Sequence, residues 1–520
     1  MTAAAEIPAR RSRRDRMSKP GKSAPTGSSQ KVSGPSASAR WLGARAGSWL
    51  ARPLASFHLV VTIATLLTTL GLVMVLSASG VVEYAGGGSA YSLFNQQALF
   101  AVFGAVLFYI ALRIPLRLLR QASFPTFALS VLALLLVLVP GIGTSVQGAR
   151  RWLMFGPVSV QPSEIVKVTL IVWGAHLLAS RRSDQASLKD ILVPLVPAGL
   201  LVCLLIVVQP NLSTTVAVGL VLGSLLWYGG LPVRLFVTIA ISGVIAAGVL
   251  AMSAGYRSNR VRSFFNPGTD TQGDNYQARQ ALYSLADGGI WGRGLGQSRA
   301  KWSYLPNAHN DFIFAIIGEE LGFLGCGLVL ALLALFVYTG IRIASRSADP
   351  FLRLLTASAT TWIAGQALIN IGYVVGLLPV TGLQLPLVSA GGSSLAITLL
   401  MFGLIANAAR HEPEAVAALH AGQDGRFSRL LRLPKPEVYS PARADAARAR
   451  SAAARAARSA EKARADRARQ ALPPARRPQP GSDSGRRRAP ERRGTSSLRA
   501  TRAWEPNYPV NHARDRGRSR

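Results

Sequence analysis

Cations and a carboxylate stand close together near the middle of the chain. The segment from residue 253 to residue 311 ends in Asp311, and Arg150 and Arg151 stand in the segment 141–163. Guanidinium groups bind phosphate oxygens in bidentate pairs, so the arginines favour an anionic ligand. The alternatives are that long loops carry cations without a ligand and that Asp311 only stabilises a helix N-terminus. The cations of the first segment are Arg257, Arg260, Arg262, Arg279, Arg293, Arg299 and Lys301.

Four ionisable residues lie inside apolar runs. Glu164 and Lys167 are three residues apart, which puts them on one face of a helix, and we expect them to form an internal ion pair. Glu319 and Glu320 follow Asp311 in a second apolar run. Ionisable residues inside a membrane span are costly, so each is expected to have a functional or a paired structural role. For the first pair the structural role is favoured.

Two glycine-rich stretches and one histidine give less specific signals. GGIWGRGLGQ (288–297) and SAGGSSL (389–395) lack the Lys-Ser/Thr pair of a nucleotide-binding loop. They are consistent with tight turns that let the backbone approach a ligand or a neighbouring helix. His309 has no second histidine near it in the sequence, so the spacing does not indicate a metal site.

The elements that must hold these residues are apolar helices. The 520-residue chain is 49% hydrophobic and 16% charged. Apolar runs of about 20 residues, the length that crosses a bilayer core of about 30 Å, recur through its middle. These runs exclude a soluble globular protein and a fibrous protein. We expect an all-α polytopic membrane protein with about ten transmembrane helices, over residues 57–79, 97–113, 123–140, 164–180, 190–208, 212–228, 233–252, 312–341, 352–377 and 391–409.

The charge distribution orients these helices. Residues 1–52 hold 11 Lys/Arg against 2 Asp/Glu, and residues 410–520 hold 27 against 11, so 25 of the 34 excess positive charges lie in the two tails. An even number of helices puts both termini on one side, which the positive-inside rule makes the cytoplasm. Residues 253–311, between helices seven and eight, then form a large extracytoplasmic loop. The short cytoplasmic loops agree, since they carry Arg113, Arg117, Arg120, Arg181, Arg182, Lys189, Arg234, Arg342, Arg346 and Arg353.

The chain therefore divides into three parts. We expect a disordered basic cytoplasmic tail over 1–52, a ten-helix membrane domain over 53–410 and a disordered Ala/Arg/Pro-rich cytoplasmic tail over 411–520. Residues 441–472 have high helix propensity but no apolar residue larger than Ala before Leu472, which predicts a helix without a core. The basic tails suit an acidic partner or anionic lipid, with a solvated tail as the alternative, and no specific nucleic acid is indicated.

Four segments carry a resemblance to a known family. They read GARRWLMFGPVSVQPSEIVK (148–167), NPGTDTQGDNYQARQALYSLADGGIWGRGLGQS (266–298), KWSYLPNAHNDFIFAIIGEELG (301–322) and LLPVTGLQLPLVSAGGSS (377–394). In this order they resemble the shape, elongation, division and sporulation family, over about residues 55 to 410 of the chain. The loop sequences and the long basic tails favour the cell-division branch over the elongation branch. The resemblance thus implies a multi-pass protein of the plasma membrane at the division septum.

The resemblance implies an enzyme. Family members are glycosyltransferases that polymerise lipid II, a lipid-linked disaccharide-pentapeptide, into peptidoglycan strands at the outer face of the membrane. By this resemblance Asp311 is the catalytic residue, a base that takes the proton of the acceptor sugar hydroxyl. The leaving group is a lipid diphosphate, so one carboxylate suffices, and inversion at the sugar carbon is expected. Expected diphosphate-binding residues are Arg150, Arg151, Arg260, Arg262, Arg279 and Gln280, and supporting residues are Glu164, Lys167, His309, Glu320, Ser389, Gly391 and Gly392.

Partners are implied in the same way. Family members pair with a single-pass class B penicillin-binding protein, a transpeptidase, and with other division membrane proteins; acidic cytoplasmic division proteins could bind the tails. No cofactor is evident, and a divalent cation recruited by the diphosphate is open. A lipid II flippase, an elongation-type paralogue and a non-catalytic division scaffold are the alternatives.

The chain departs from the pattern of many relatives at three positions. They are Asn211 in QPNLST, Asn310 in HNDF and Thr381 in LPVTGL. Many relatives have an acidic residue in the first of these loops, threonine in place of Asn310, and a lysine in the third loop. Any role for these three residues is therefore open, whereas Asp311 and the arginines are unaffected.

Overall fold

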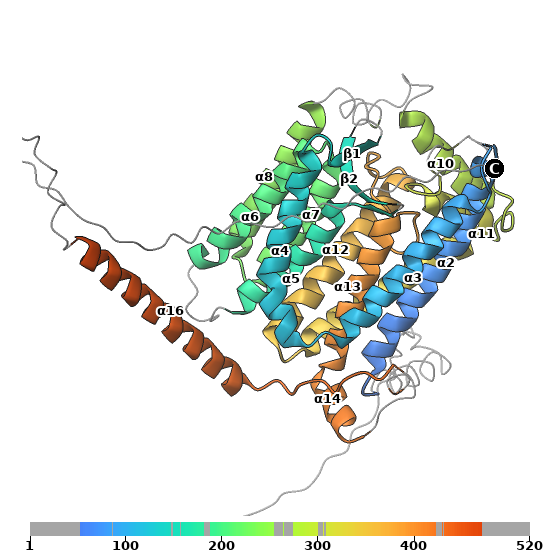
Figure 1. The fold of residues 1–520 in the computed structure, drawn as a ribbon. Coiled ribbons are helices and arrows are strands. Elements are labelled where there is room, and N and C mark those ends of the chain that lie inside the picture. Colours follow the sequence, from blue (N-terminus) through green and yellow to red (C-terminus); the bar gives the residue numbers. More distant parts are fainter. Residues whose placement is uncertain are drawn as a thin grey trace, which may run out of the picture. The chain divides into compact units, whose positions relative to one another are not determined.

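The computed structural model describes residues 52–85, 87–146, 149–156, 158–180, 188–253, 264, 274–299, 305, 308–422, 429 and 431–470. The chain forms two compact units, residues 1–445 and 446–520, and each is described by itself. The first unit is a bundle of long helices with a small sheet at one end (Figure 1). We call this end, which also carries α10 (Asp274–Gly288), the sheet end, and the opposite end, which carries α14 (Pro413–His420), the α14 end.

Each of the ten apolar runs expected from the sequence overlaps a helix, and no run extends more than three residues beyond it. In chain order these helices are α2 (Ala55–Ala85), α3 (Ser92–Arg113), α4 (Leu116–Leu138), α5 (Pro162–Ala179), α6 (Leu188–Val208), α7 (Leu212–Tyr228), α8 (Val233–Ser253), α11 (Ile313–Arg346), α12 (Pro350–Val374) and α13 (Gly392–Arg410). The most extensive packing joins α13 to α3, α11 to α12 and α4 to α5. The first of these pairs joins helices that are far apart in sequence, whereas the other two join consecutive helices.

Seven of the described helices are long and apolar enough to cross a membrane: α2, α3, α4, α5, α8, α11 and α13. Leu192–Val208 of α6 and the whole of α7 are shorter apolar helices. Polar residues such as Arg353, Gln366 and Asn370 interrupt the apolar sequence of α12, which meets neither description. The protein is a multi-span membrane protein, and ten spans stays a prediction.

A small antiparallel sheet forms in the connection between α4 and α5, where the sequence predicted no element. Strand β1 (Gly143–Val146) pairs with β2 (Ala149–Phe155), which pairs with β3 (Val158–Val160). Aromatic and β-branched residues in β2 and β3 favour extended backbone, and Gly156, with φ of 61°, allows the turn between them. Apart from this sheet, the described fold is helical.

Helix α11 is interrupted at Gly322, whose φ of 67° and ψ of −165° are not helical. The stretch 288–297 packs against this break. The N–H of Arg293 donates to the carbonyl oxygen of Glu319, and the N–H of Phe323 donates to that of Gly289, both at 2.9 Å. A Cβ atom at Gly292 would overlap the carbonyl carbon and oxygen of Glu320. This stretch is therefore a tight turn whose backbone approaches a neighbouring helix, as its glycines predicted.

The folded structure continues past residue 410, where we expected the membrane domain to end. Helix α14 buries Val416 and Leu419, three residues apart on one face. Residues 431–437 then run along the α14 end: the Tyr109 hydroxyl donates to the carbonyl oxygen of Leu431 (3.1 Å) and Arg410 Nη2 donates to that of Pro434 (2.8 Å). Residues 411–422 and 431–437 thus contribute packed structure, because they include buried apolar and hydrogen-bonding residues that a purely polar tail lacks.

The helix predicted over residues 441–472 is present as α16 (Pro441–Gln470). Its described side chains are exposed, in keeping with a sequence that offers no apolar face. The expected disorder of residues 1–51 and 471–520 lies outside the described residues.

Candidate active site

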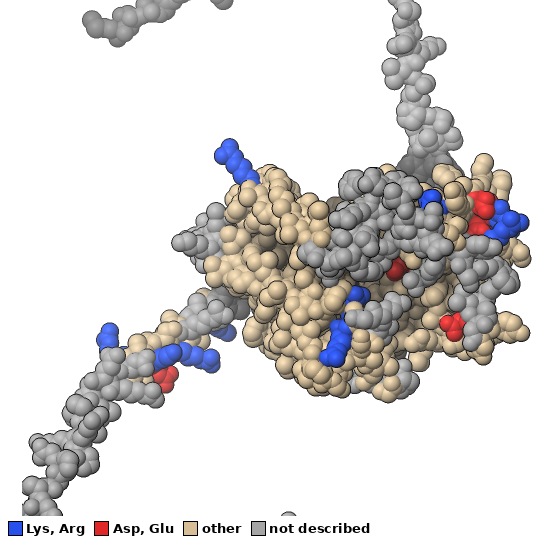
Figure 2. Space-filling view, turned by 90° about the horizontal axis from the view of Figure 1, so that it is seen from above, with Lys and Arg blue, Asp and Glu red and all other residues tan. Residues whose placement is uncertain are grey.

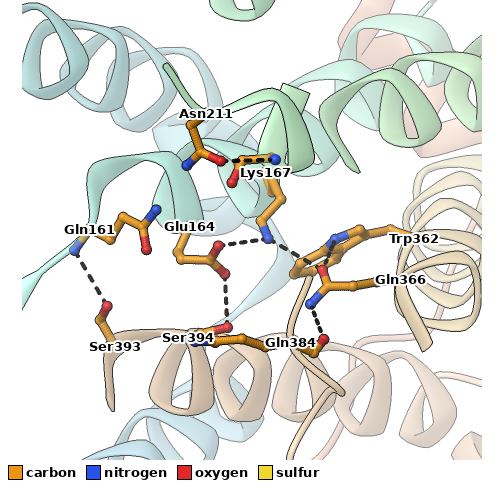
Figure 3. A network of polar contacts seen from close by, with 10 residues as sticks. Gln161, Glu164, Lys167, Asn211, Trp362, Gln366, Gln384, Ser393 and Ser394 are labelled. Atoms are coloured by element: carbon orange, nitrogen blue, oxygen red, sulfur yellow. Dashed lines mark hydrogen bonds and ion pairs between the residues drawn. The ribbon is translucent and has the colours of Figure 1, made fainter. Parts of the chain in front are cut away.

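A buried ion pair joins two residues of α5 near the sheet end. Lys167 Nζ lies 2.9 Å from Glu164 Oε1, and the two side chains are only 1% and 8% exposed. Ser394, in the first turn of α13, donates its hydroxyl to Glu164 Oε2 at 3.0 Å (Figure 3). The internal pair that the spacing predicted is thus present, and it also ties α5 to α13.

Helix α12 contacts the ammonium group of Lys167. Lys167 Nζ lies 3.4 Å from Gln366 Oε1 and 4.8 Å from the centre of the Trp362 ring. The indole nitrogen of Trp362 also donates to Gln366 Oε1, at 3.0 Å (Figure 3). Two donors at one oxygen fix the orientation of the Gln366 amide. Its Nε2 therefore faces the carbonyl oxygen of Gln384, 3.0 Å away.

The segment between α12 and α13 extends these contacts to residues 309 and 310. Gln384 Nε2 donates to Asn310 Oδ1 at 2.6 Å and to the carbonyl oxygen of Ala390 at 3.2 Å. The N–H of Ala390 donates to the carbonyl oxygen of His309 at 3.0 Å. Residues 309 and 310 are therefore both held by this segment, and Asp311 is the next residue.

Asp311 lies just before α11 and is partly exposed. Helix α11 begins after Phe312, which makes no side-chain cap hydrogen bond. The carbonyl oxygen of Asp311 lies 3.0 Å from Asn370 Nδ2 and 2.8 Å from the Tyr373 hydroxyl oxygen. A Cβ atom at Gly382, where φ is 77°, would stand 3.4 Å from Asp311 Oδ2. The absence of a side chain at position 382 thus leaves room beside the carboxylate.

Asn370 and Tyr373 together tie residue 311 to residue 383. Asn370 Nδ2 lies 2.6 Å from the carbonyl oxygen of Leu383 and 2.6 Å from Tyr373 Oη, and that hydroxyl lies 2.8 Å from the same carbonyl. The amide nitrogen has two hydrogens and the phenol has one. These three hydrogens can make one hydrogen bond to each of the two backbone carbonyl oxygens and one hydrogen bond between the side chains of Asn370 and Tyr373. Both residues are fully buried, so this clamp is shielded from water.

Ser389, Gly391 and Gly392 lie where this segment turns into α13. Ser389 Oγ accepts from the N–H of Leu385 at 2.8 Å, which closes the turn. The side-chain oxygen of Gln97, from α3, accepts from the N–H groups of Gly391 and Gly392, both at 3.2 Å. A Cβ atom at Gly391 would overlap the side-chain amide of Gln384. These residues hold the turn against α3 and leave room for Gln384.

His309 precedes the first turn of α11 and is partly buried. Burial lowers the pKa of His309, and the nearby carboxylate of Glu83 opposes this shift. The imidazole is therefore neutral at pH 7. Among the described residues, no group of three or more His, Cys, Asp and Glu side chains is arranged to hold a metal ion.

The two glutamates of α11 lie deeper in the bundle and have separate partners. Glu320 accepts from the Ser77 hydroxyl, which lies 2.7 Å from both carboxylate oxygens. Glu319 accepts from the Ser298 hydroxyl and from the N–H of Arg299, both at 2.6 Å. Glu320 thus ties α11 to α2, while Glu319 holds the glycine-rich turn at the break in α11.

The arginines expected to bind diphosphate are in different situations. Arg150 is exposed on β2, whereas Arg151 donates from Nε to the carbonyl oxygen of Gln209 (3.3 Å) and from Nη2 to that of Pro210. Arg279 and Gln280 lie partly buried on α10. Arg260 and Arg262 lie outside the described residues. Seen from the sheet end, the charged side chains that show on the described surface stand apart rather than forming one patch (Figure 2).

Several residues of the site were not identified from the sequence. They share side chains that hydrogen-bond to backbone or to one another across different helices: Gln97, Trp362, Gln366, Asn370, Tyr373 and Gln384. The only signal for them in the sequence is that amide and phenol groups interrupt apolar runs. Asn211, in contrast, accepts from the N–H of Thr214 as the N-cap of α7, which accounts for it structurally.

Comparison with known proteins identifies the family. The profile of the FtsW/RodA/SpoVE family, described as cell cycle protein, matches residues 57–414. The chain is 58% identical over 406 residues to the probable peptidoglycan glycosyltransferase FtsW of Mycobacterium tuberculosis, covering 78% of each chain. It is 38% identical over 354 residues to the stage V sporulation protein E of Bacillus subtilis, covering 68% of this chain and 96% of that protein.

Solved structures share the fold. Rod shape determining protein RodA of Thermus thermophilus matches with a TM-score of 0.52 and 26% identity, over 70% of this chain and 99% of that one. A chain from a study of the structural coordination of polymerization and crosslinking by a peptidoglycan synthase complex matches with a TM-score of 0.56 and 26% identity, over 68% of this chain and 97% of that one. The chain therefore belongs to the FtsW/RodA/SpoVE family, the shape, elongation, division and sporulation family that its sequence resembles.

Proposed function

We propose that this protein is a peptidoglycan glycosyltransferase that polymerises lipid II into glycan strands during septal cell division. The observation that carries the proposal is the placement of Asp311: a partly exposed carboxylate, before a membrane helix, whose peptide is held by buried side chains. The extensive identity to a probable peptidoglycan glycosyltransferase FtsW supports the same reaction and substrate.

In the proposed reaction the Asp311 carboxylate takes the proton of an acceptor sugar hydroxyl. The hydroxyl oxygen attacks the anomeric carbon of a second lipid-linked sugar, a glycosidic C–O bond forms, and the bond from that carbon to the diphosphate breaks. Cationic side chains stabilise the charge on the departing lipid diphosphate. Among the described candidates Arg150 is exposed, whereas Arg151 already donates to two carbonyl groups.

The test is strand formation by the purified full-length chain, with its proposed transpeptidase partner, from labelled lipid II. Asp311→Asn keeps the size of the side chain and removes its basicity, so we expect strand formation to fall at least about 100-fold. Asp287→Asn is a matched control, since Asp287 lies on α10 at the same end and pairs with Arg293 at 3.2 Å. Its activity should equal that of the wild type. Unchanged strand formation by Asp311→Asn would show that the base is elsewhere.

The proposal includes an orientation in the plasma membrane at the division site. The sheet end faces the outside and both termini face the cytoplasm, which is what the distribution of Lys and Arg supports. A membrane-impermeant thiol reagent should label Asn275→Cys in intact cells and Gln185→Cys only after permeabilisation. Labelling in the reverse order would contradict this orientation.

A class B penicillin-binding protein is the proposed crosslinking partner. Support comes from the match to a chain studied for the coordination of polymerization and crosslinking in a peptidoglycan synthase complex. Co-purification of the full chain with that transpeptidase, and faster strand formation by the pair than by the chain alone, is the expected result.

A further inference from the structure

Gln384 is the residue on which the contacts around residues 309 to 311 converge. Its side-chain nitrogen donates to Asn310 Oδ1 at 2.6 Å and to the backbone carbonyl oxygen of Ala390 at 3.2 Å. The backbone carbonyl oxygen of Gln384 accepts from Gln366 Nε2 at 3.0 Å. The amide nitrogen has only two hydrogens, so both are used. Gln384 has no part in the proposed proton transfer or in the departure of the diphosphate, so its hydrogen bonds must have another role.

The direction of these hydrogen bonds is set from inside the bundle. Gln366 Oε1 accepts from both Lys167 Nζ and Trp362 Nε1, as Figure 3 shows. If the Gln366 amide were reversed, its NH₂ group would face an ammonium and an indole N–H, and its oxygen would face the carbonyl oxygen of Gln384. The buried ion pair of α5 therefore fixes Gln366, which in turn fixes the backbone at position 384.

Each of the residues 309, 310 and 311 is held by the segment 382–391 or by the clamp beside it. His309 is bound through Ala390 and Asn310 through Gln384. Asp311 shares Asn370 and Tyr373 with Leu383, the residue before Gln384. Three consecutive residues with three separate restraints leave the backbone at Asp311 little freedom. Because the Asp311 side chain is attached to this restrained backbone, these hydrogen bonds also determine the position of its carboxylate.

We propose that Gln384 and Gln366 are positioning residues for Asp311: they transmit the fixed geometry of the buried Glu164–Lys167 pair, through Asn310, to the carboxylate that acts on the substrate. This inference rests on the proposed function of Asp311. It also gives Asn310, one of the departures from the pattern of many relatives, a partner in this chain.

The experiment compares Gln384→Met, which keeps the volume of the side chain and removes both donors, with the wild type as the full-length chain. A displaced base lowers the rate of the chemical step and leaves substrate binding alone. We expect kcat for lipid II to fall roughly 10-fold to 100-fold and KM to stay within about twofold. Gln384→Glu should lose at least as much activity, because a carboxylate would place acceptors against Asn310 Oδ1 and the Ala390 carbonyl.

A double-mutant cycle tests the path through Asn310. Asn310→Ala should reproduce the loss in kcat, and the double variant with Gln384→Met should lose no more than either single variant. The matched control is Asn407→Ala, which removes a buried amide that donates to the carbonyl oxygens of Ala111 and Ile114 at the α14 end. It should be less stable but keep the wild-type kcat, measured well below its unfolding temperature.

Hydrogen exchange separates this inference from the proposed function. Peptides that contain residues 308–314 should exchange faster in Gln384→Met than in the wild type and in Asn407→Ala. Faster exchange with no strand formation by the wild type would refute the proposed function and leave the restraint on residue 311 in place. Unchanged exchange, or a wild-type kcat in Gln384→Met when Asp311→Asn is inactive, would overturn the positioning role. Additive losses in the cycle would overturn the path through Asn310.

Discussion

The two ends of the helical bundle use charged and polar side chains in different ways. Near the sheet end the Glu164–Lys167 pair is buried, and every contact described for it leads to another buried or partly buried group. At the α14 end, Arg120 pairs with Asp349, whose side chain is 7% exposed, while two further ion pairs bridge separate segments at the surface: Arg346 with Glu414, and Arg117 with Glu437 at 3.2 Å. In the latter pair the side chains are 76% and 55% exposed.

Exposed and buried ion pairs differ in how freely their charged groups can move. Water and salt compensate an exposed charge when its partner moves, so the two surface pairs have many arrangements of similar free energy. A buried charge has no such compensation and holds its neighbours in one arrangement. The buried Glu164–Lys167 pair thus supplies, near Asp311, the rigid surroundings that a catalytic group needs.

The largest effect is expected for Lys167→Met, which breaks the buried pair. The Glu164 carboxylate would be left buried with Ser394 as its remaining described partner, and the unfolding free energy should fall by about 3 to 5 kcal/mol. Chemical unfolding in detergent, followed by tryptophan fluorescence, measures this change. The double variant Glu164→Gln with Lys167→Met removes both charges and should recover most of the loss. A double variant as unstable as Lys167→Met would mean that packing of the lysine chain, and not charge pairing, is the main contribution.

A smaller loss is expected for Asn407→Ala at the α14 end. The carbonyl oxygen of Ala111 would normally accept from the N–H of residue 115, but that residue is Pro115 and has none. Asn407 Nδ2 supplies this hydrogen at 2.8 Å and binds the carbonyl oxygen of Ile114 at 3.0 Å. Leaving these carbonyls without their donor should cost about 1 to 3 kcal/mol, measured in the same unfolding experiment. No loss would mean that water replaces the amide.

The Glu164–Lys167 pair was predicted from the sequence, whereas the contacts of Asn407 were not. Ten apolar runs, the spacing of Glu164 and Lys167, and the glycines of 288–297 each follow from local periodicity or residue type, and the structure has a helix, an ion pair and a tight turn at these places. Each of these features depends on residues close together in sequence. The helix over 441–472 is of the same kind.

The features that sequence reasoning missed depend on contacts between distant segments. Gln384 and Asn310 are 74 positions apart, and Gln97 and Gly391 are 294 apart, so no periodic pattern joins them. The packed structure after residue 410 was missed for a similar reason, since it is held by Tyr109 on α3. Composition alone describes such a segment as polar and proline-rich, whereas its partners become visible only in the fold.

Glu412, at the α14 end, is a buried carboxylate with incomplete hydrogen bonding, and it can be compared with the fully paired carboxylate of Glu164. Burial raises the pKa of Glu412, while a hydrogen bond from Ser56 and the guanidinium groups of Arg346 and Arg342 oppose the shift. Its Oε1 has no hydrogen-bond partner among the described residues.

A raised pKa in the folded state means that the native protein holds this proton to higher pH than the unfolded chain. The stabilising contribution is therefore complete below the unfolded pKa and is lost as pH rises through the folded pKa. We expect Glu412→Gln to be more stable than the wild type at pH 7 and 8, and the difference to disappear as the pH falls below the ordinary pKa of glutamate. A variant that is less stable at pH 7 would show that the two arginines dominate.

The smallest effect is expected for Arg117→Ala, which removes the most exposed ion pair of this comparison. The Glu437 carboxylate that loses its partner is itself mostly exposed, so water replaces the guanidinium at little cost. Residues 431–434 stay attached through Tyr109 and Arg410. The unfolding free energy should change by less than about 0.5 kcal/mol, and this small difference should shrink further when salt is raised to about 1 M. A loss comparable to that of Lys167→Met, unaffected by salt, would remove the distinction between the two ends, because it would mean that an exposed pair restrains the bundle as strongly as a buried one.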